Sequence, residues 1–94
     1  MRMSPSQLRE TFKIALQDRA PKAAKEMQRD GTLEAFLGRM TQMVSEQVDM
    51  AADRANLKHS SDPVEAVQEA NYAVNVAQEV ALAQVIEEID ALNL

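Results

Sequence analysis

The sequence predicts an all-α fold: an elongated bundle of three long antiparallel helices, which we expect to dimerise. Three observations lead to this prediction. The composition favours helices, because the chain has only 2 Gly, 3 Pro, 2 Phe, 1 Tyr and no Trp, whereas Ala, Glu, Gln and Met are plentiful. Apolar side chains recur at spacings of three and four residues, which places them on one side of a helix. Proline and glycine separate three segments of similar length, and the 94 residues suffice for one domain, 1–94.

The first segment, residues 5–30, has a clear start and an interruption. Ser4 followed by Pro5 is typical of an N-cap with proline at the first helical position. An apolar stripe follows, made of Leu8, Phe12, Ala15 and Leu16. Pro21 cannot donate a backbone hydrogen bond, and its ring collides with a carbonyl of the preceding turn. We therefore predict a first helix that is kinked or split at Pro21.

The second and third segments, residues 33–58 and 63–91, also have local boundary signals. Gly31 is a natural left-handed cap for the preceding helix, and Asp62 followed by Pro63 is typical of a helix start. The second segment carries a long apolar stripe of Leu33, Phe36, Leu37, Met40, Met43, Val44, Val48, Ala51 and Ala55. Each segment would be roughly 38 to 43 Å long at 1.5 Å per residue, and a compact globule of this chain length only about 32 Å across. The bundle should therefore be elongated.

The last predicted helix is apolar around most of its circumference. One row of small side chains would let another helix approach closely: Ala66, Ala70, Ala73, Ala77 and Ala81. A second apolar row lies well around the helix: Tyr72, Val76, Val80, Ala83 and Ile86. Only a narrow polar strip remains: Gln68, Asn71, Asn75, Gln78 and Glu79. A surface helix of a monomer needs an apolar stripe of little more than about 100°. Either the flanking helices cover both rows, or, as we expect, the second row is an interface with another chain.

A basic stripe at the end of the first segment supports an alternative function. The first 30 residues hold seven Lys or Arg against four Asp or Glu, whereas the remainder holds three against eleven. The stripe itself consists of Arg19, Lys22, Lys25 and Arg29. Such a stripe suits the phosphate oxygens of nucleic acid, but the net charge of −5 and the interruptions at Glu26 and Asp30 favour a solvated face. A small nucleic-acid-binding regulator is the alternative hypothesis.

An acidic stripe on the second segment consists of Glu46, Asp49 and Asp53 at positions i, i+3 and i+7. Three carboxylates could hold Mg²⁺ or Ca²⁺ with further oxygen ligands, but the chain has no Glu-x-x-His pair and no calcium loop. Pairing of this acidic stripe with the basic stripe is a plainer possibility. His59, the one histidine, is followed by Ser60, Ser61 and Asp62, but a helix cap and a loop explain these residues better than a catalytic group does. We therefore expect no metal, no cofactor and no enzymatic activity.

These observations predict a small, non-enzymatic, helical protein-interaction module. Its partner is expected to be a second copy, because two-fold symmetric dimers are the commonest oligomers, or else another helical protein. The chain has no Cys, and its N-terminus has no apolar signal region, so we expect a cytoplasmic protein. No segment has the roughly 20 predominantly apolar residues that would cross a membrane.

Overall fold

The computed structural model describes the backbone of residues 2–57 and 63–93, and the side chains of residues 2–55 and 71–93. Within these residues the chain is helical and contains no strand, which confirms the all-α prediction. The helices are α1 (Pro5–Arg19), α2 (Pro21–Asp30), α3 (Leu33–Leu57) and α4 (Pro63–Leu92). The described part therefore has four helices where we predicted three long ones.

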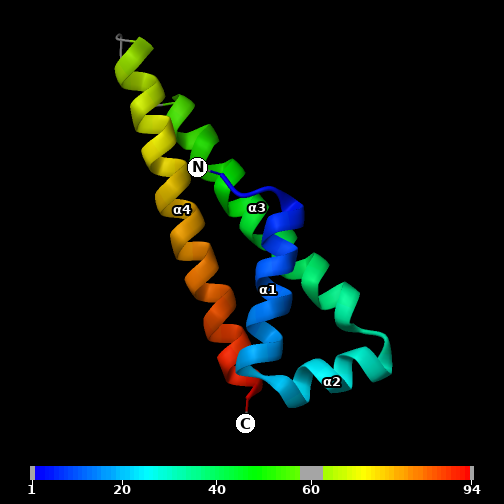
Figure 1. Cartoon of the computed structure of the whole chain (residues 1–94). Helices are drawn as coiled ribbons and strands as arrows, with labels where there is room; N and C mark the ends of the chain where they lie inside the picture. Colours follow the sequence, from blue (N-terminus) through cyan, green and yellow to red (C-terminus); the bar gives the residue numbers. More distant parts are fainter. Residues whose placement is uncertain (1, 58–62, 94) are drawn as a thin grey trace.

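The fourth helix arises because the first segment is split at Ala20. The N–H of Ala20 still reaches the carbonyl of Leu16, so α1 is complete up to that point. Ala20 then leaves the helical conformation, with φ −136° and ψ 64°, and Pro21 begins a new helix at its first position. A proline at that position loses nothing, because a first-turn N–H has no partner within the helix. As a result α2 turns away from the axis of α1 (Figure 1) and ends at Gly31, which adopts the left-handed conformation with φ 77°.

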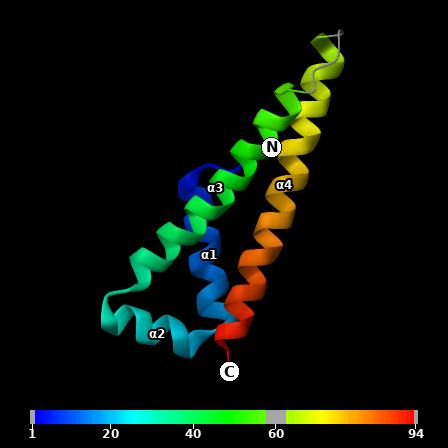
Figure 2. The ribbon, with the colours of Figure 1, turned by 180° about the vertical axis from the view of Figure 1, so that it is seen from behind.

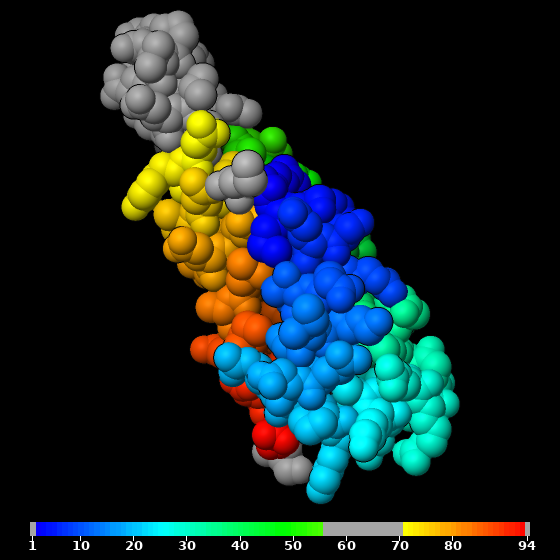
Figure 3. All heavy atoms as spheres, in the orientation of Figure 1, coloured from blue at the N-terminus to red at the C-terminus, as the bar shows by residue number. Residues whose placement is uncertain are grey.

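The long helices α3 and α4 form an antiparallel hairpin, and α1 packs against both of them. In Figure 1 α1 lies in front of the hairpin and runs in the same direction as α4, opposite to α3. Figure 3 shows its side chains filling this face between the two hairpin helices. Seen from behind, in Figure 2, α3 and α4 lie in front and α1 is behind them. The molecule measures 54 × 20 × 16 Å, so the predicted elongation is confirmed.

The core lies where α1, α3 and α4 meet. The apolar stripes predicted for the first two segments point into it, and α4 contributes its C-terminal half. Its fully buried members, all at most 2% exposed, are Leu8, Phe12, Leu16, Ala20, Leu37, Val44, Val48, Ala81, Val85 and Ile89. Because this core needs only one side of α4, much of that helix is left without cover from its own chain.

Polar contacts hold α1 on the hairpin at both of its ends. Near the start, the Arg2 guanidinium lies 2.6 Å from the Asp49 carboxylate, and Arg9 pairs with Glu34. At the end, Arg19 donates to both carboxylate oxygens of Asp90 at 3.1 Å. All of these side chains are largely exposed, so each pair contributes only about 0 to 1 kcal/mol. These ion pairs fix the position of α1 on the hairpin and add little to the stability of the fold.

The start of α1 provides a first testable prediction. Ser4 forms a capping box, in which its hydroxyl accepts the Gln7 N–H at 3.2 Å and the Gln7 side chain accepts the Ser4 N–H at 2.8 Å. We expect Ser4→Ala to lower the free energy of unfolding by about 1 kcal/mol, because a first-turn N–H loses its acceptor. Urea denaturation followed by circular dichroism measures this change. Ser6→Ala, exposed in the same turn, is the control; an equal loss in both variants would contradict a role for the cap.

Candidate functional site

The second apolar row of α4 is the first feature of a candidate site. Tyr72 is 73% exposed, Val80 50% and Val76 39%, and Ala83 is also exposed. Ile86 differs from these four, because it is half-buried and packs against the core. At 100° per residue, Ile86 lies at one edge of this row, about 120° around the helix from Val80 and about 40° from Tyr72. The predicted row of five is therefore divided, with four residues facing outward and one turned toward the bundle.

The orientation of α4 places a polar side chain inside the protein. Gln78 belongs to the narrow polar strip of this helix, yet it is only 9% exposed. Its side-chain oxygen accepts the backbone N–H of Met3 at 2.7 Å. A buried N–H without an acceptor is costly, and Gln78 removes that cost where the chain enters α1. The outward side of α4 consequently carries valine and tyrosine side chains where a surface helix would normally be polar.

The adjacent helix α3 adds to this exposed apolar surface. Met50 is 53% exposed. It shares with Val80 a hollow of about 270 Å³ between the two helices, lined by Gln47, Met50, Ala51, Arg54, Ala77 and Val80. The interface residues that we predicted from the sequence all lie on α4, and Met50 of α3 was not among them. A signal was present in the sequence, because Met43 and Met50 are seven residues apart and so lie on the same side of a helix.

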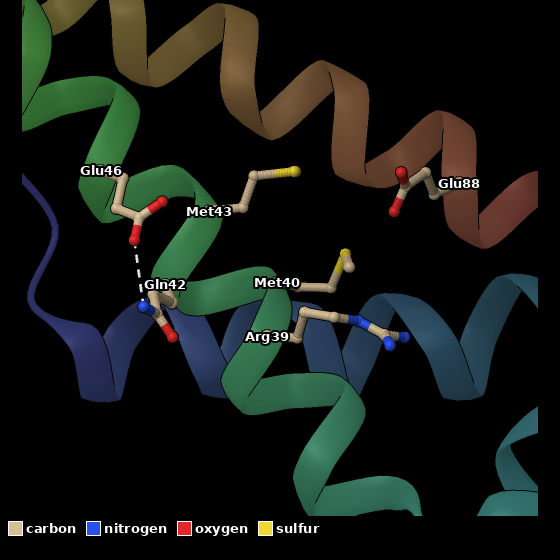
Figure 4. Close-up of a pocket in the computed structure, with 6 residues that line it drawn as sticks. All are labelled: Arg39, Met40, Gln42, Met43, Glu46 and Glu88. Carbon is tan, nitrogen blue, oxygen red and sulfur yellow. Dashed lines mark hydrogen bonds between the residues drawn. The ribbon is translucent and has the colours of Figure 1, made fainter.

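A second hollow, of about 430 Å³, lies toward the C-terminal end of α4; we call the line of the two hollows, with the contact between Gln47 and Gln84 separating them, the groove. The second hollow is lined by Arg39, Met40, Gln42, Met43, Glu46 and Glu88. Figure 4 shows Arg39 and Glu88 projecting from α3 and α4 on either side of it. Glu46 accepts a hydrogen bond from Gln42 at 3.0 Å, and the Arg39 guanidinium lies 5.8 Å from the centre of the Phe36 ring. The hollow therefore combines soft methionine side chains with charges of both signs at its rim.

We call the surface that contains both hollows the open face. It lies on the side of the hairpin away from α1, because α1 contacts the other flank of α3, where Arg9 pairs with Glu34. Its apolar residues are Met43, Met50, Val76, Val80 and Ala83, with Tyr72 at the edge. Its charged residues are Arg39, Glu46, Arg54 and Glu88, which line the hollows, and Glu87. The side-chain amides of Gln47 and Gln84 meet between the two hollows at 3.0 Å.

The basic stripe is divided by the break at Ala20. Arg19 ends α1 and is engaged with Asp90, whereas the other three bases lie on α2. Lys22, Lys25 and Arg29 are exposed there, and Arg29 lies 4.0 Å from Asp30. The structure therefore does not bring the four residues together on one continuous helix.

The acidic stripe on α3 does not face the basic stripe. Asp49 pairs with Arg2, and Glu46 is turned toward Gln42. In the described part of the chain, no three His, Cys, Asp or Glu side chains gather as metal ligands would. His59 and the predicted cap at Asp62 lie outside the described residues.

None of the helices, over the residues that the structure describes, combines the length and the apolar character needed to cross a lipid bilayer. No protein-family model, curated protein or solved structure matches this chain.

Proposed function

We propose that this chain is a small, non-enzymatic, helical protein-interaction module that forms a homodimer through its open face. One observation carries the proposal. Of the six large apolar side chains that are exposed among the described residues, four lie on the open face or at its edge: Met50, Tyr72, Val76 and Val80. A contiguous exposed apolar patch rimmed by polar residues is typical of a protein-interaction site. Isolated exposed apolar residues, such as Ile14 on α1, need no such explanation.

The shape and composition of the open face suit a partner helix. The two hollows form a groove between α3 and α4, and a helix pair can receive side chains from another helix pair in such a groove. Methionine adapts its shape to a partner, and tyrosine offers a large apolar ring with a polar end. A second copy brings the same groove and the same side chains, so each favourable contact of a two-fold dimer occurs twice.

We do not extend the proposal to nucleic-acid binding. That alternative depended on four bases aligned along one helix, and Arg19 is engaged with Asp90 at the end of α1. The three bases that remain on α2 have no aromatic side chain among them. Recognition of nucleic acid normally draws on more contacts than three exposed bases.

The molar mass in solution tests the proposal. We expect light scattering after size exclusion to give about twice the 10.4 kDa of one chain. The measurement should cover micromolar to submillimolar protein and low to high salt, because an apolar interface depends little on salt whereas charge-driven association weakens as salt rises. A mass of one chain throughout this range would contradict the homodimer.

A further inference from the structure

The hairpin provides a register for comparing positions on its two helices. The hydrogen bond between Gln47 and Gln84 places these residues at one level along the groove. Because the helices are antiparallel, Met50 and Val80 then lie at nearly one level, in agreement with the hollow that they share. These two exposed side chains form the apolar centre of the open face.

Charged residues flank that centre at equal distances on α3. Glu46 lies four residues before Met50 and Arg54 four residues after it, about 6 Å away in each direction at 1.5 Å per residue. Both line the groove, Glu46 at one hollow and Arg54 at the other. When a second copy is turned end over end about this centre, its Arg54 lies opposite Glu46 of the first copy, and its Glu46 lies opposite Arg54.

Residues on α4 also lie at equal distances about Val80, but they are not charge pairs. Val76 and Gln84 each lie four residues from it, and Tyr72 and Glu88 each lie eight residues from it. Apolar residues are thus on one side of Val80, and polar or acidic residues are on the other. A copy turned end over end brings Val76 level with Gln84 of the partner, so α4 adds no charge pair to the one on α3.

Two arrangements of a two-fold dimer could bring the open faces together. With the symmetry axis along the helices, α3 of one protomer lies on α4 of the other at the same level. Glu46, Glu87 and Glu88 of both protomers then gather at one end, where these six carboxylates outnumber the two Arg39 side chains, and Arg54 lies level with Ala77. Like charges brought together disfavour an arrangement.

When the symmetry axis runs across the helices, α3 of one protomer lies antiparallel on α3 of the other, and the two α4 helices pack in the same way. Each Glu46 then faces Arg54 of the partner, and the acidic groups of the two protomers lie at opposite ends. Met50 meets Met50 and Val80 meets Val80 on the axis. Resting on the proposed function, we propose this antiparallel four-helix dimer, with α1 and α2 of each protomer on the outside.

Single cysteines test the arrangement, because the chain has no cysteine of its own. A disulfide needs Cα atoms about 4.4 to 6.8 Å apart. We expect Met50→Cys and Val80→Cys each to form a disulfide-linked dimer under mild oxidation. Ile14→Cys is the matched control, since Ile14 is 57% exposed but lies on α1. Its cross-linked fraction should be at least about tenfold lower, because only random collision joins it.

The possible outcomes separate this inference from the proposed function. Cross-linking of each variant to itself supports the antiparallel dimer. Cross-linking only in a mixture of Met50→Cys with Val80→Cys would show the parallel arrangement and overturn the inference, while leaving the dimer in place. A dimeric mass without either cross-link would also overturn the inference. A monomeric mass for the unmodified protein would overturn both.

Reversing the charge of Glu46 is an independent test, because it should weaken dimerisation in one arrangement and strengthen it in the other. In the antiparallel dimer Glu46→Arg places two arginines opposite each other twice, so we expect dimerisation about tenfold weaker. Adding Arg54→Glu should restore it to within about threefold, because the pair is re-formed in reverse. In the parallel arrangement Glu46→Arg would instead meet Glu87 and Glu88 and tighten the dimer. A tighter dimer would therefore overturn the inference.

Discussion

Val80→Glu is expected to convert the homodimer to a monomer. Val80 is half exposed in the single chain, so that chain can accept a charged residue there without changing its core. In the proposed dimer, however, the two new carboxylates would meet near the symmetry axis, and Arg54, which lines the same hollow, already faces Glu46 of the partner. Burying an unpaired charge costs several kcal/mol. We expect the dissociation constant to rise by at least about 100-fold, which corresponds to about 2.7 kcal/mol.

Light scattering of Val80→Glu at several concentrations measures the loss, and circular dichroism should show unchanged helicity. Ile14→Glu is the matched control, because it puts the same charge at a similarly exposed branched residue on α1. That variant should keep the dimeric mass. A dimer of unchanged stability in Val80→Glu would remove the open face as the interface, and loss of the dimer in both variants would indicate a general effect of added charge.

Phe12→Ala is expected to cause the largest loss of stability. The Phe12 side chain is fully buried where α1 meets the hairpin, among Leu8, Leu16 and Leu37. Its removal leaves a cavity that the three surrounding helices can only partly close. Such replacements cost about 3 to 5 kcal/mol, a large fraction of the 5 to 15 kcal/mol typical of a domain.

Chemical denaturation followed by circular dichroism measures the effect of Phe12→Ala. Protein concentration must be held constant, because the stability of a dimer depends on it. Ile14→Ala also shortens an apolar side chain, at an exposed position two residues away, and we expect it to cost at most about 0.5 kcal/mol. Equal losses in the two variants would contradict the position of α1 in the core.

The boundaries of the helices could be predicted from the sequence because they depend on local chemistry. Ser4 with Pro5 at one start, Gly31 at one end and Pro63 at another start each act through a few neighbouring backbone groups. The same is true of the stripes on α1 and α3, where apolar residues occupy one side of the helix and the other side is charged. A helix with one apolar side can be buried in only one orientation.

The break at Ala20 is an intermediate case. Pro21 determines that the helix cannot continue undisturbed, but a kink and a split both satisfy the backbone. The split is chosen by packing, because it carries α2 across the end of the bundle, where Ala24 is buried in the same core as Leu33 and Phe36. That choice also separated Arg19 from the other three bases of the basic stripe.

What the sequence by itself determined about this protein is where its helices begin and end and which sides of α1 and α3 are buried. The rotation of α4 was decided only by the tertiary structure. This helix is apolar on so many sides that several orientations bury similar apolar area, and the hydrophobic effect has no direction with which to choose among them. Contacts between distant parts of the chain accompany the observed rotation: Ala81, Val85 and Ile89 are buried against α1 and α3, Gln78 accepts the Met3 N–H, and Arg19 donates to Asp90. With Gln78 turned inward, Val76 and Val80 were left on the surface.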